Sequence, residues 1–415
     1  MALQTNTLPR ISEASVQSDL SVPIRSVSTS FYRPELDALR FFAFLGVFQL
    51  HAAYTYSIYV RNGAPRWVQT VHHVSYAGAF GVDLFFVLSA YLITELLLRE
   101  KARNGSLDVR AFYVRRILRI WPIYFFCIFL ALIPAFNALH TFSWRYALAF
   151  LFLAGNWSFM AWGAPLRSIA KALWTVSIEE QFYLLWPPIV RRISPNRLTW
   201  VAVTMIVLST AMRSVLLILH AQPNSVKWNT LARLDPIAAG IFIASVLHGR
   251  LPTLSVASRL AMLASSLLSL VLVSNNWRLA IPPSLEVIPT IVGYPCVTVA
   301  CTVILLAVLG FPARIPRVLA YLGKISYGLY VYHLMALVLT TRLLGDVAYV
   351  LRVLQRGTGL VNWLRLDHAG LGQLMFREAL WLATTIFLAG ISYAFLEKPF
   401  LQLKKRFELV RSRPV

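Results

Sequence analysis

One apolar stretch of the sequence carries an arginine and a histidine, two residue types that are rare inside a membrane helix. In LRFFAFLGVFQLHAAY, residues 39–54, Arg40 lies near the start and His51 follows eleven residues later. At about 100° per residue, eleven residues return to within roughly 20° of the same helix face, and the two side chains lie about 16 Å apart along the axis. A shared face favours a functional path, with histidine as the natural general base. The structural alternatives are an arginine that reaches the lipid headgroups and a hydrogen-bonded core histidine.

Carboxylates in two other apolar stretches are candidate partners of this histidine. GAFGVDLFFVLSAYLI contains Asp83, with Ser89 two turns further on, and ALWTVSIEEQFYLLWPP contains Glu179 and Glu180. Ionisable groups inside a membrane are costly, so each is a candidate for function, and the alternative is a network of buried ion pairs that holds the bundle together. Neighbours on a helix differ by about 100°, so we expect one of the two glutamates to face the site while the other braces the helix.

A third group of charged residues is basic. In FYVRRILRIWP, Arg116 and Arg119 are three residues apart and share a helix face, whereas Arg115 points elsewhere. Arginines on one face are suited to bidentate contacts with phosphates. Their alternative role is ordinary positive charge on the cytoplasmic side of a membrane protein.

The elements that position these residues are membrane helices. The chain has 415 residues, of which 58% are hydrophobic and 13% are charged, and its mean hydropathy is +0.64. This composition is too apolar for a soluble globule of this size. The net charge of +22 does not indicate nucleic-acid binding, because the basic residues gather at the ends of apolar runs. The three cysteines lie in apolar stretches, and no spacing typical of a disulfide framework or a metal site is present.

We expect an all-α integral membrane protein, a polytopic bundle of about ten transmembrane helices with one candidate re-entrant segment. The transmembrane helices are expected at 38–56, 77–98, 119–137, 172–190, 199–220, 231–248, 255–273, 288–310, 325–345 and 378–396. Residues 1–30 are expected to form a flexible cytoplasmic tail, 31–400 the transmembrane domain and 401–415 a basic cytoplasmic tail.

Charge predicts the orientation of the bundle. Seven basic residues lie between Arg99 and Arg119, so this loop and the N-terminus two spans earlier are expected in the cytoplasm. Segment 144–162 is ambiguous, since a crossing there would move every later loop to the other side. A non-crossing segment places about 24 Lys and Arg inside and about 10 outside, which favours ten spans with both termini in the cytoplasm. Its weak point is Arg352, Arg356 and Arg365, which then lie in a long external loop.

Five motifs, taken in order, resemble the membrane-bound acyltransferase family three, the O-acyltransferases of bacterial surface glycans and of some small natural products. They are LDALRFFAFLGVFQLHA, GVDLFFVLSAYLI, FYVRRILRIWP, LWTVSIEEQFYLLWP and ISYGLYVYH. The resemblance covers about residues 31–400 and includes two weaker features, RLDPIAAG with Asp235 and FLEKPF at 395–400.

The resemblance assigns family positions residue by residue. The arginine–histidine pair of the family falls on Arg40 and His51, and its Arg-x-x-Arg falls on Arg116 and Arg119. Its Ser-x-Glu-Glu-Gln-Phe-Tyr falls on Ser177, Glu179, Glu180, Gln181, Phe182 and Tyr183. Ala90 departs from the family, which usually has glycine after Ser89, and we expect tighter packing there without loss of chemistry.

The resemblance also implies a mechanism. Acyl-CoA, with acetyl-CoA the expected donor, would dock from the cytoplasm with its phosphates on Arg116 and Arg119 and bring its thioester towards His51. His51 would take the proton of an acceptor hydroxyl, and Glu179 or Glu180 would orient or stabilise its imidazole. An acyl-histidine intermediate is the alternative.

Further residues receive supporting roles in this scheme. Arg40, Ser89 and Tyr183 are candidate donors to the oxyanion, and Asp83 is a further candidate catalytic carboxylate. His333 is expected to line the thioester path, with simple packing as the alternative. Ser177 and Asp235 are expected to be structural or to line the substrate.

The expected function is therefore an enzyme of the bacterial inner membrane that transfers an acyl group other than aminoacyl. The acceptor would be a hydroxyl of a surface glycan, a lipid-linked sugar or a small molecule, with no nucleic acid and no metal involved. The alternative is a secondary transporter of a small polar or acylated solute, although no inverted repeat is visible.

Overall fold

The computed structural model describes residues 32–136, 141–166, 168–222, 224–277, 279, 285–353 and 370–407. The tail expected at 1–30, residues 408–415 of the basic tail, and Arg356 and Arg365 lie outside these ranges. The described chain is helical and contains no β-strand, which confirms the all-α fold class.

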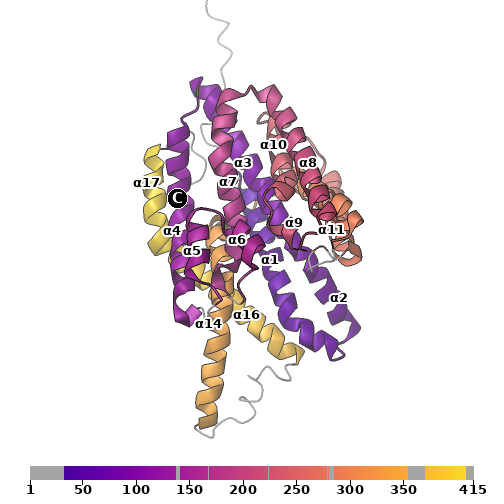
Figure 1. Ribbon diagram of the computed structural model, residues 1–415, viewed down its shortest axis with the longest axis vertical. Helices are drawn as coiled ribbons and strands as arrows, with labels where there is room; N and C mark the ends of the chain where they lie inside the picture. The colour runs from indigo at the N-terminus through magenta and orange to yellow at the C-terminus, as the bar shows by residue number, and fades with distance from the viewer. Residues whose placement is uncertain are drawn as a thin grey trace, which may run out of the picture.

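The molecule is a bundle of long helices joined by short ones (Figure 1). In chain order the α-helices are α1 (Pro34–Arg61), α2 (Arg66–Ser75), α3 (Gly81–Asn104), α4 (Val109–Leu132), α5 (Trp144–Leu151), α6 (Gly155–Trp162), α7 (Trp174–Arg192), α8 (Pro195–Ile218), α9 (Ser225–Trp228), α10 (Leu234–Leu247), α11 (Val256–Trp277), α12 (Tyr294–Val308), α13 (Arg317–Lys324), α14 (Ser326–Val353), α16 (Leu371–Ser392) and α17 (Lys398–Lys404). Short 3₁₀ turns include η2 (Tyr76–Phe80), η4 (Ile169–Leu173) and η5 (Leu231–Arg233), and π turns lie at η6 (Pro289–Gly293) and η7 (Tyr393–Glu397).

Each of the ten predicted spans overlaps a helix, but not all of these helices are both long and apolar enough to cross a membrane. Among the described residues, 7 helices meet both conditions for crossing a membrane, and α4, α7 and α10 are not among them. The reason is chemical for two of these helices, since α4 carries the arginine cluster and α7 the glutamate pair. The third, α10, has only 14 residues. The helices with Arg40, His51 and Asp83, by contrast, meet both conditions.

The ambiguous segment 144–162 folds into two short helices. Helices α5 and α6 have 8 residues each, about 12 Å of helix against about 30 Å of bilayer hydrocarbon. Between them Leu153 adopts a positive φ of 58°, and Gly155 lies directly under the ring of Phe150. A Cβ at Gly155 would come within 2.1 Å of that ring, so a side chain there would open the turn. This geometry fits a segment that does not cross.

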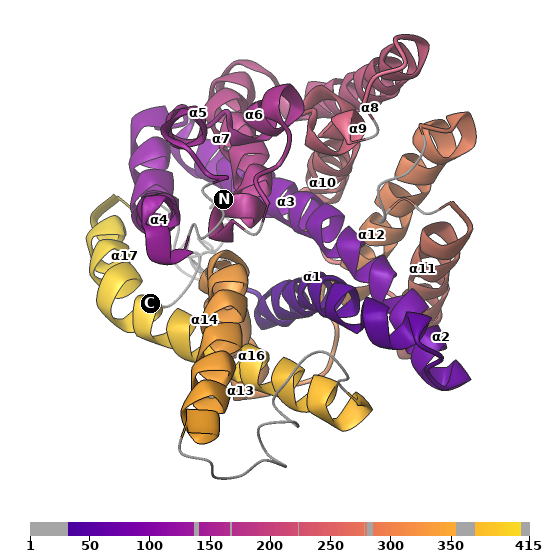
Figure 2. The same cartoon turned by 60° about the horizontal axis from the view of Figure 1, so that its bottom comes forward.

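Two apolar cores share α1 and α3. Phe44 and Phe48 of α1 belong to a core completed by α4, α7, α14 and α16. Leu39 and Ala43 of the same helix belong to a second core, with α10, α11 and α12. Figure 2 shows α1 and α3 lying between these two groups of helices. The pair α1 and α3 is therefore the element from which both sides of the site are built.

Small residues bring helix backbones into contact at this centre. Gly240 of α10 lies against α3, where an added Cβ would be 2.2 Å from the carbonyl oxygen of Val87. It would also be 2.9 Å from the Cβ of Ala90, which is fully buried. Close approach through small residues is a usual way to pack membrane helices. Ala90 thus occupies the α3–α10 contact, in keeping with the expected tight packing.

Buried ion pairs connect several of the helices. Arg213 of α8 pairs with Asp235 of α10 at 3.1 Å, and the carboxylate of Asp235 also accepts hydrogen bonds from Ser209 and from Thr298 of α12. Charged groups in a membrane interior are normally paired in this way. Asp235 therefore joins three helices.

Candidate functional site

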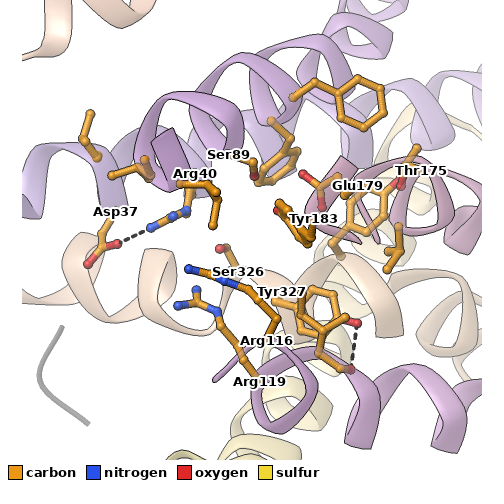
Figure 3. Close-up of a pocket in the computed structure, with 18 of the residues that line it drawn as sticks. Asp37, Arg40, Ser89, Arg116, Arg119, Thr175, Glu179, Tyr183, Ser326 and Tyr327 are labelled. Atoms are coloured by element: carbon orange, nitrogen blue, oxygen red, sulfur yellow. Dashed lines mark hydrogen bonds and ion pairs between the residues drawn. The ribbon is translucent and has the colours of Figure 1, made fainter. Parts of the chain in front are cut away.

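Four arginines line a pocket of about 140 Å³, which we call the arginine pocket. Arg33 lies directly before α1, and the other three lie on helices. Arg40 comes from α1, and Arg116 and Arg119 come from α4. Figure 3 shows their guanidinium groups pointing into the same space. Arg40 donates a hydrogen bond to Asp37 at 3.0 Å. Arg116 and Arg119 donate none to any residue in the described part of the chain, and Nε of Arg116 is buried without a partner.

The helix period explains why two of the three adjacent arginines of α4 reach the pocket. Arg116 and Arg119 lie one turn apart on the same face, and Arg116 lies over the ring of Tyr183 at 5.6 Å. Arg115 faces α3 instead, where it pairs with Glu100 at 2.6 Å and donates to the carbonyl of Phe407. Arg115 is a structural residue of the α3–α4 contact.

The remaining wall of the arginine pocket is formed by α3, α7 and α14. Glu179 and Tyr183 of α7 and Ser89 of α3 lie together across from the arginines (Figure 3). Glu180 points away from the pocket and accepts a hydrogen bond from the indole of Trp121 at 3.0 Å. The adjacent glutamates therefore face different surroundings, one in the pocket and one against α4.

His51 lines a second and larger space of about 780 Å³, which we call the histidine cavity. Its side chain is half-buried and makes no hydrogen bond to a residue that the structure describes. The ring of His333 lies 5.1 Å away, centroid to centroid. With a ring nitrogen unengaged and a large cavity beside it, His51 is placed to exchange a proton with a bound molecule.

His333 is a fully buried neighbour that lines neither compartment. Its Nδ1 lies 2.5 Å from the carbonyl oxygen of Tyr330, so Nδ1 carries the proton and donates. Nε2 is buried without a hydrogen-bond partner. Its backbone carbonyl accepts a bond from Trp381, which ties α14 to α16.

Asp83 also lines the histidine cavity, but its carboxylate is already paired. Arg233 donates to it at 2.6 Å, and both side chains are buried. Arg233 in turn lies over the ring of Tyr294 at 5.0 Å. Removing one partner of such a pair leaves the other as an uncompensated buried charge. The geometry thus favours the structural alternative for Asp83.

The two compartments meet at Val82 of α3 and Tyr330 of α14, which line both of them. The hydroxyl of Tyr330 lies 2.9 Å from Oγ1 of Thr175 and donates to the carbonyl of Ala172. These bonds hold the phenol in place against α7 and η4. Val82 and Tyr330 therefore mark the place where the two compartments adjoin.

The structure separates residues that the sequence led us to expect together. It brings six predicted residues into the arginine pocket, and these are Arg40, Ser89, Arg116, Arg119, Glu179 and Tyr183. Of the catalytic candidates, His51 and Asp83 alone line the histidine cavity. Glu179 therefore does not lie beside His51 as expected, because the sequence of one helix does not determine which neighbours each of its faces meets in the bundle.

Three predicted residues lie outside both compartments in addition to His333. Glu180 bonds to Trp121, Ser177 lies 3.3 Å from the hydroxyl of Tyr124, and Asp235 belongs to the network with Arg213. None of the three lines either space.

Sequence reasoning missed two lysines of the histidine cavity. Lys171 lies in η4 and Lys227 in α9, and both line the cavity with His51. Each is a single charge in a short connection between apolar helices, IAKALW and SVKWNT. The sequence signal that could have identified the two lysines is that each stands in its connection without an acidic residue beside it.

Comparisons with known proteins give one family match and several relatives. A family model described as an acyltransferase domain matches residues 33–396. The putative peptidoglycan O-acetyltransferase YrhL of Bacillus subtilis is 34% identical over 232 residues, which are 52% of this chain and 33% of that protein. The peptidoglycan O-acetyltransferase OatA of Listeria monocytogenes is 27% identical over 400 residues, 89% of this chain and 56% of that protein.

The O-acetyltransferase OatA of Staphylococcus aureus is 30% identical over 227 residues, covering 52% of this chain and 35% of that protein. The chain thus spans between about a third and a little over half of the length of these relatives. No solved structure matches it.

Proposed function

We propose that this chain, which belongs to the acyltransferase family three, is a membrane-embedded O-acyltransferase that moves an acetyl group from acetyl-CoA to a glycan hydroxyl. The family predicted from five motifs is confirmed by the match over residues 33–396. The glycan acceptor is supported by relatives whose names specify peptidoglycan O-acetylation. Membership of this family speaks against the transporter alternative.

The arginine pocket is the proposed site for the phosphates of the donor. Its residues fit such a group, because two half-buried guanidinium groups have no hydrogen-bond acceptor among the described residues and a third is engaged only by Asp37. Planar guanidinium groups bind phosphate oxygens in pairs of parallel hydrogen bonds. Glu179 and Asp37 line the same pocket and offset part of its positive charge.

His51 is the proposed general base. Bound acyl-CoA supplies an activated thioester, and the long thin arm that carries it passes Val82 and Tyr330 to reach the histidine cavity. His51 takes the proton from the acceptor hydroxyl as that oxygen attacks the thioester carbonyl. The C–S bond then breaks, and the departing CoA thiolate takes the proton back from His51, which leaves the acetyl ester and the free CoA thiol. His333 packs beside its ring and is a positioning residue in this scheme.

The single observation that carries the proposal is the arrangement of the two compartments along α1. Arg40 near the start of the helix opens into the arginine pocket, and His51, about 16 Å further on, opens into the histidine cavity. A donor with phosphates at one end and a reactive group at the other matches this spacing. The large cavity then leaves room for a sugar beside His51.

The proposed orientation places the arginine pocket towards the cytoplasm, where CoA is available, and both termini in the cytoplasm of a bacterial inner membrane. The distribution of Lys and Arg supports it. A reactive tag at residue 415 should be protected from an impermeant reagent in intact cells and labelled after lysis. Labelling in intact cells would contradict the ten-span arrangement.

Transfer itself is tested with purified full-length protein in nanodiscs. Incubation with radiolabelled acetyl-CoA and peptidoglycan fragments should label the glycan, and the His51→Ala variant should not. Mass spectrometry should find these acetyl groups on glycans from cells that carry the gene and not on glycans from cells that lack it. Absence of acetylated product in both assays would contradict the proposed function.

A further inference from the structure

The histidine cavity has an excess of positive charge that the transfer chemistry does not explain. Lys171 and Lys227 both line it, and both are exposed. Among the described lining residues Asp83 supplies the only carboxylate, and that carboxylate is engaged by Arg233. Neither lysine ammonium has a hydrogen-bond or carboxylate partner in the described part of the protein. Two cations thus face the same space without an anion.

The two lysines come from different elements that converge beside His51. Lys171 lies in η4, directly before α7, and Lys227 lies in α9, which packs against α6 (Figure 1). The ammonium of Lys227 lies 5.9 Å from the centre of the Trp174 ring, another lining residue. Convergence of two cations from separate segments costs electrostatic free energy unless an anion offsets it.

The pKa of Lys227 is in keeping with an uncompensated positive charge in the histidine cavity. Partial desolvation in the cavity, together with the like charges of Lys171 and Arg233, lowers the pKa of the Lys227 ammonium to about 8. An opposite charge placed nearby favours the charged form of such a group. An anion bound in the cavity would therefore raise the pKa of Lys227 again.

From this geometry we propose that the histidine cavity accepts acceptors that carry an anionic group, a carboxylate or a phosphate, near the hydroxyl to be acylated, with Lys171 and Lys227 as its cationic contacts. The inference rests on the proposed function in assigning this cavity to the acceptor. The same lining offers Trp174 and Trp228 as faces for a sugar ring and Gln222 and Asn224 as polar contacts. An anionic sugar thus matches the chemistry of the wall.

The test is equilibrium binding, which does not require turnover. Full-length protein in detergent is titrated with methyl β-glucuronide, with glucose 1-phosphate and with the neutral methyl β-glucoside. The wild type should bind at least one anionic probe about tenfold or more tightly than the neutral one, and added salt should reduce the difference. The two anionic probes distinguish a carboxylate from a phosphate acceptor.

Variants then assign the preference to the two lysines. Lys171→Gln combined with Lys227→Gln should remove the preference for the anionic probe, while binding of CoA stays unchanged. The matched control Lys398→Gln, an exposed lysine outside both compartments, should behave as wild type. Size-exclusion chromatography verifies that each variant is folded.

Several outcomes would overturn the inference. Equal binding of charged and neutral probes, no measurable binding of either anionic probe at millimolar concentration, or a preference that survives in the double variant would each do so. Loss of CoA binding in the double variant would assign the lysines to the donor instead. A retained anion preference in a protein that transfers no acetyl group would contradict the proposed function alone.

Discussion

The arginine pocket and the histidine cavity are built on the same two helices but use different cations in different volumes. The pocket is about 140 Å³ and presents guanidinium groups, whereas the cavity is about 780 Å³ and presents two ammonium groups beside His51, its Arg233 being engaged by Asp83. Guanidinium groups are planar and suited to one bidentate geometry, while an ammonium is a point charge on a flexible stem. The difference teaches that the smaller space is suited to a ligand held in one defined pose and the larger space to a bulkier ligand with adaptable contacts.

The largest loss of activity is expected from substitutions at His51. His51→Ala should lower kcat by about 10²–10⁴-fold, the usual contribution of a general base. His51→Gln should not restore activity, because an amide cannot accept the proton. His73→Ala is the matched control, since His73 is exposed on α2 and lines neither compartment. Rates near wild type for His51→Ala would place the base elsewhere.

Closing the boundary between the compartments should have the next largest effect. Val82→Phe adds a ring where both spaces meet, and we expect kcat to fall by about 10²-fold, as when reacting groups are misplaced by about 1 Å. Dissociation constants for CoA and for an acceptor probe should each change little. A large loss of CoA affinity with kcat preserved would mean that donor and acceptor do not meet across this boundary.

The arginines of the pocket should act through the donor. Arg116→Ala and Arg119→Ala should each raise KM for acetyl-CoA about ten- to a hundredfold, because a hydrogen bond to a charged group is worth about 1.5–3 kcal/mol. Arg115→Ala should instead lower the unfolding temperature, since it leaves Glu100 buried without its partner. Equal increases in KM for all three variants would contradict a specific phosphate site and indicate that these arginines only set the orientation of the protein in the membrane.

His333 should show the smallest effect. His333→Asn keeps a side-chain group that can donate to the carbonyl of Tyr330, so we expect kcat to change by less than about tenfold and KM for acetyl-CoA to stay the same. Stability is followed by thermal unfolding. A large rise in KM for the donor would instead support the role along the thioester path that the sequence suggested.

What the sequence could predict depended on how local the relationship was. The spacing of Arg40 and His51 and of Arg116 and Arg119 follows from the period of one helix, and the structure keeps each pair in the expected register. The helical spans followed from hydropathy for the same reason. Where charges interrupt the apolar pattern, as in α4 and α7, hydropathy alone was a weaker guide.

Relationships between helices could not be predicted in this way. Glu179 was expected beside His51, but the rotation of α7 in the bundle turns it towards Arg40 and Arg116. Lys171 and Lys227 lie 56 positions apart in short connections, and only tertiary packing brings them to the same cavity. Side-chain packing between elements decides these contacts, and no period in the sequence encodes it.

The central claim, that donor binding and proton abstraction belong to separate compartments, is tested most directly by titrating CoA into three proteins under the same conditions. The account predicts that His51→Ala binds CoA with wild-type affinity although it forms no product, and that the Arg116→Ala, Arg119→Ala double variant loses at least about a hundredfold in affinity. Loss of CoA binding in His51→Ala, or wild-type affinity in the double arginine variant, would contradict it.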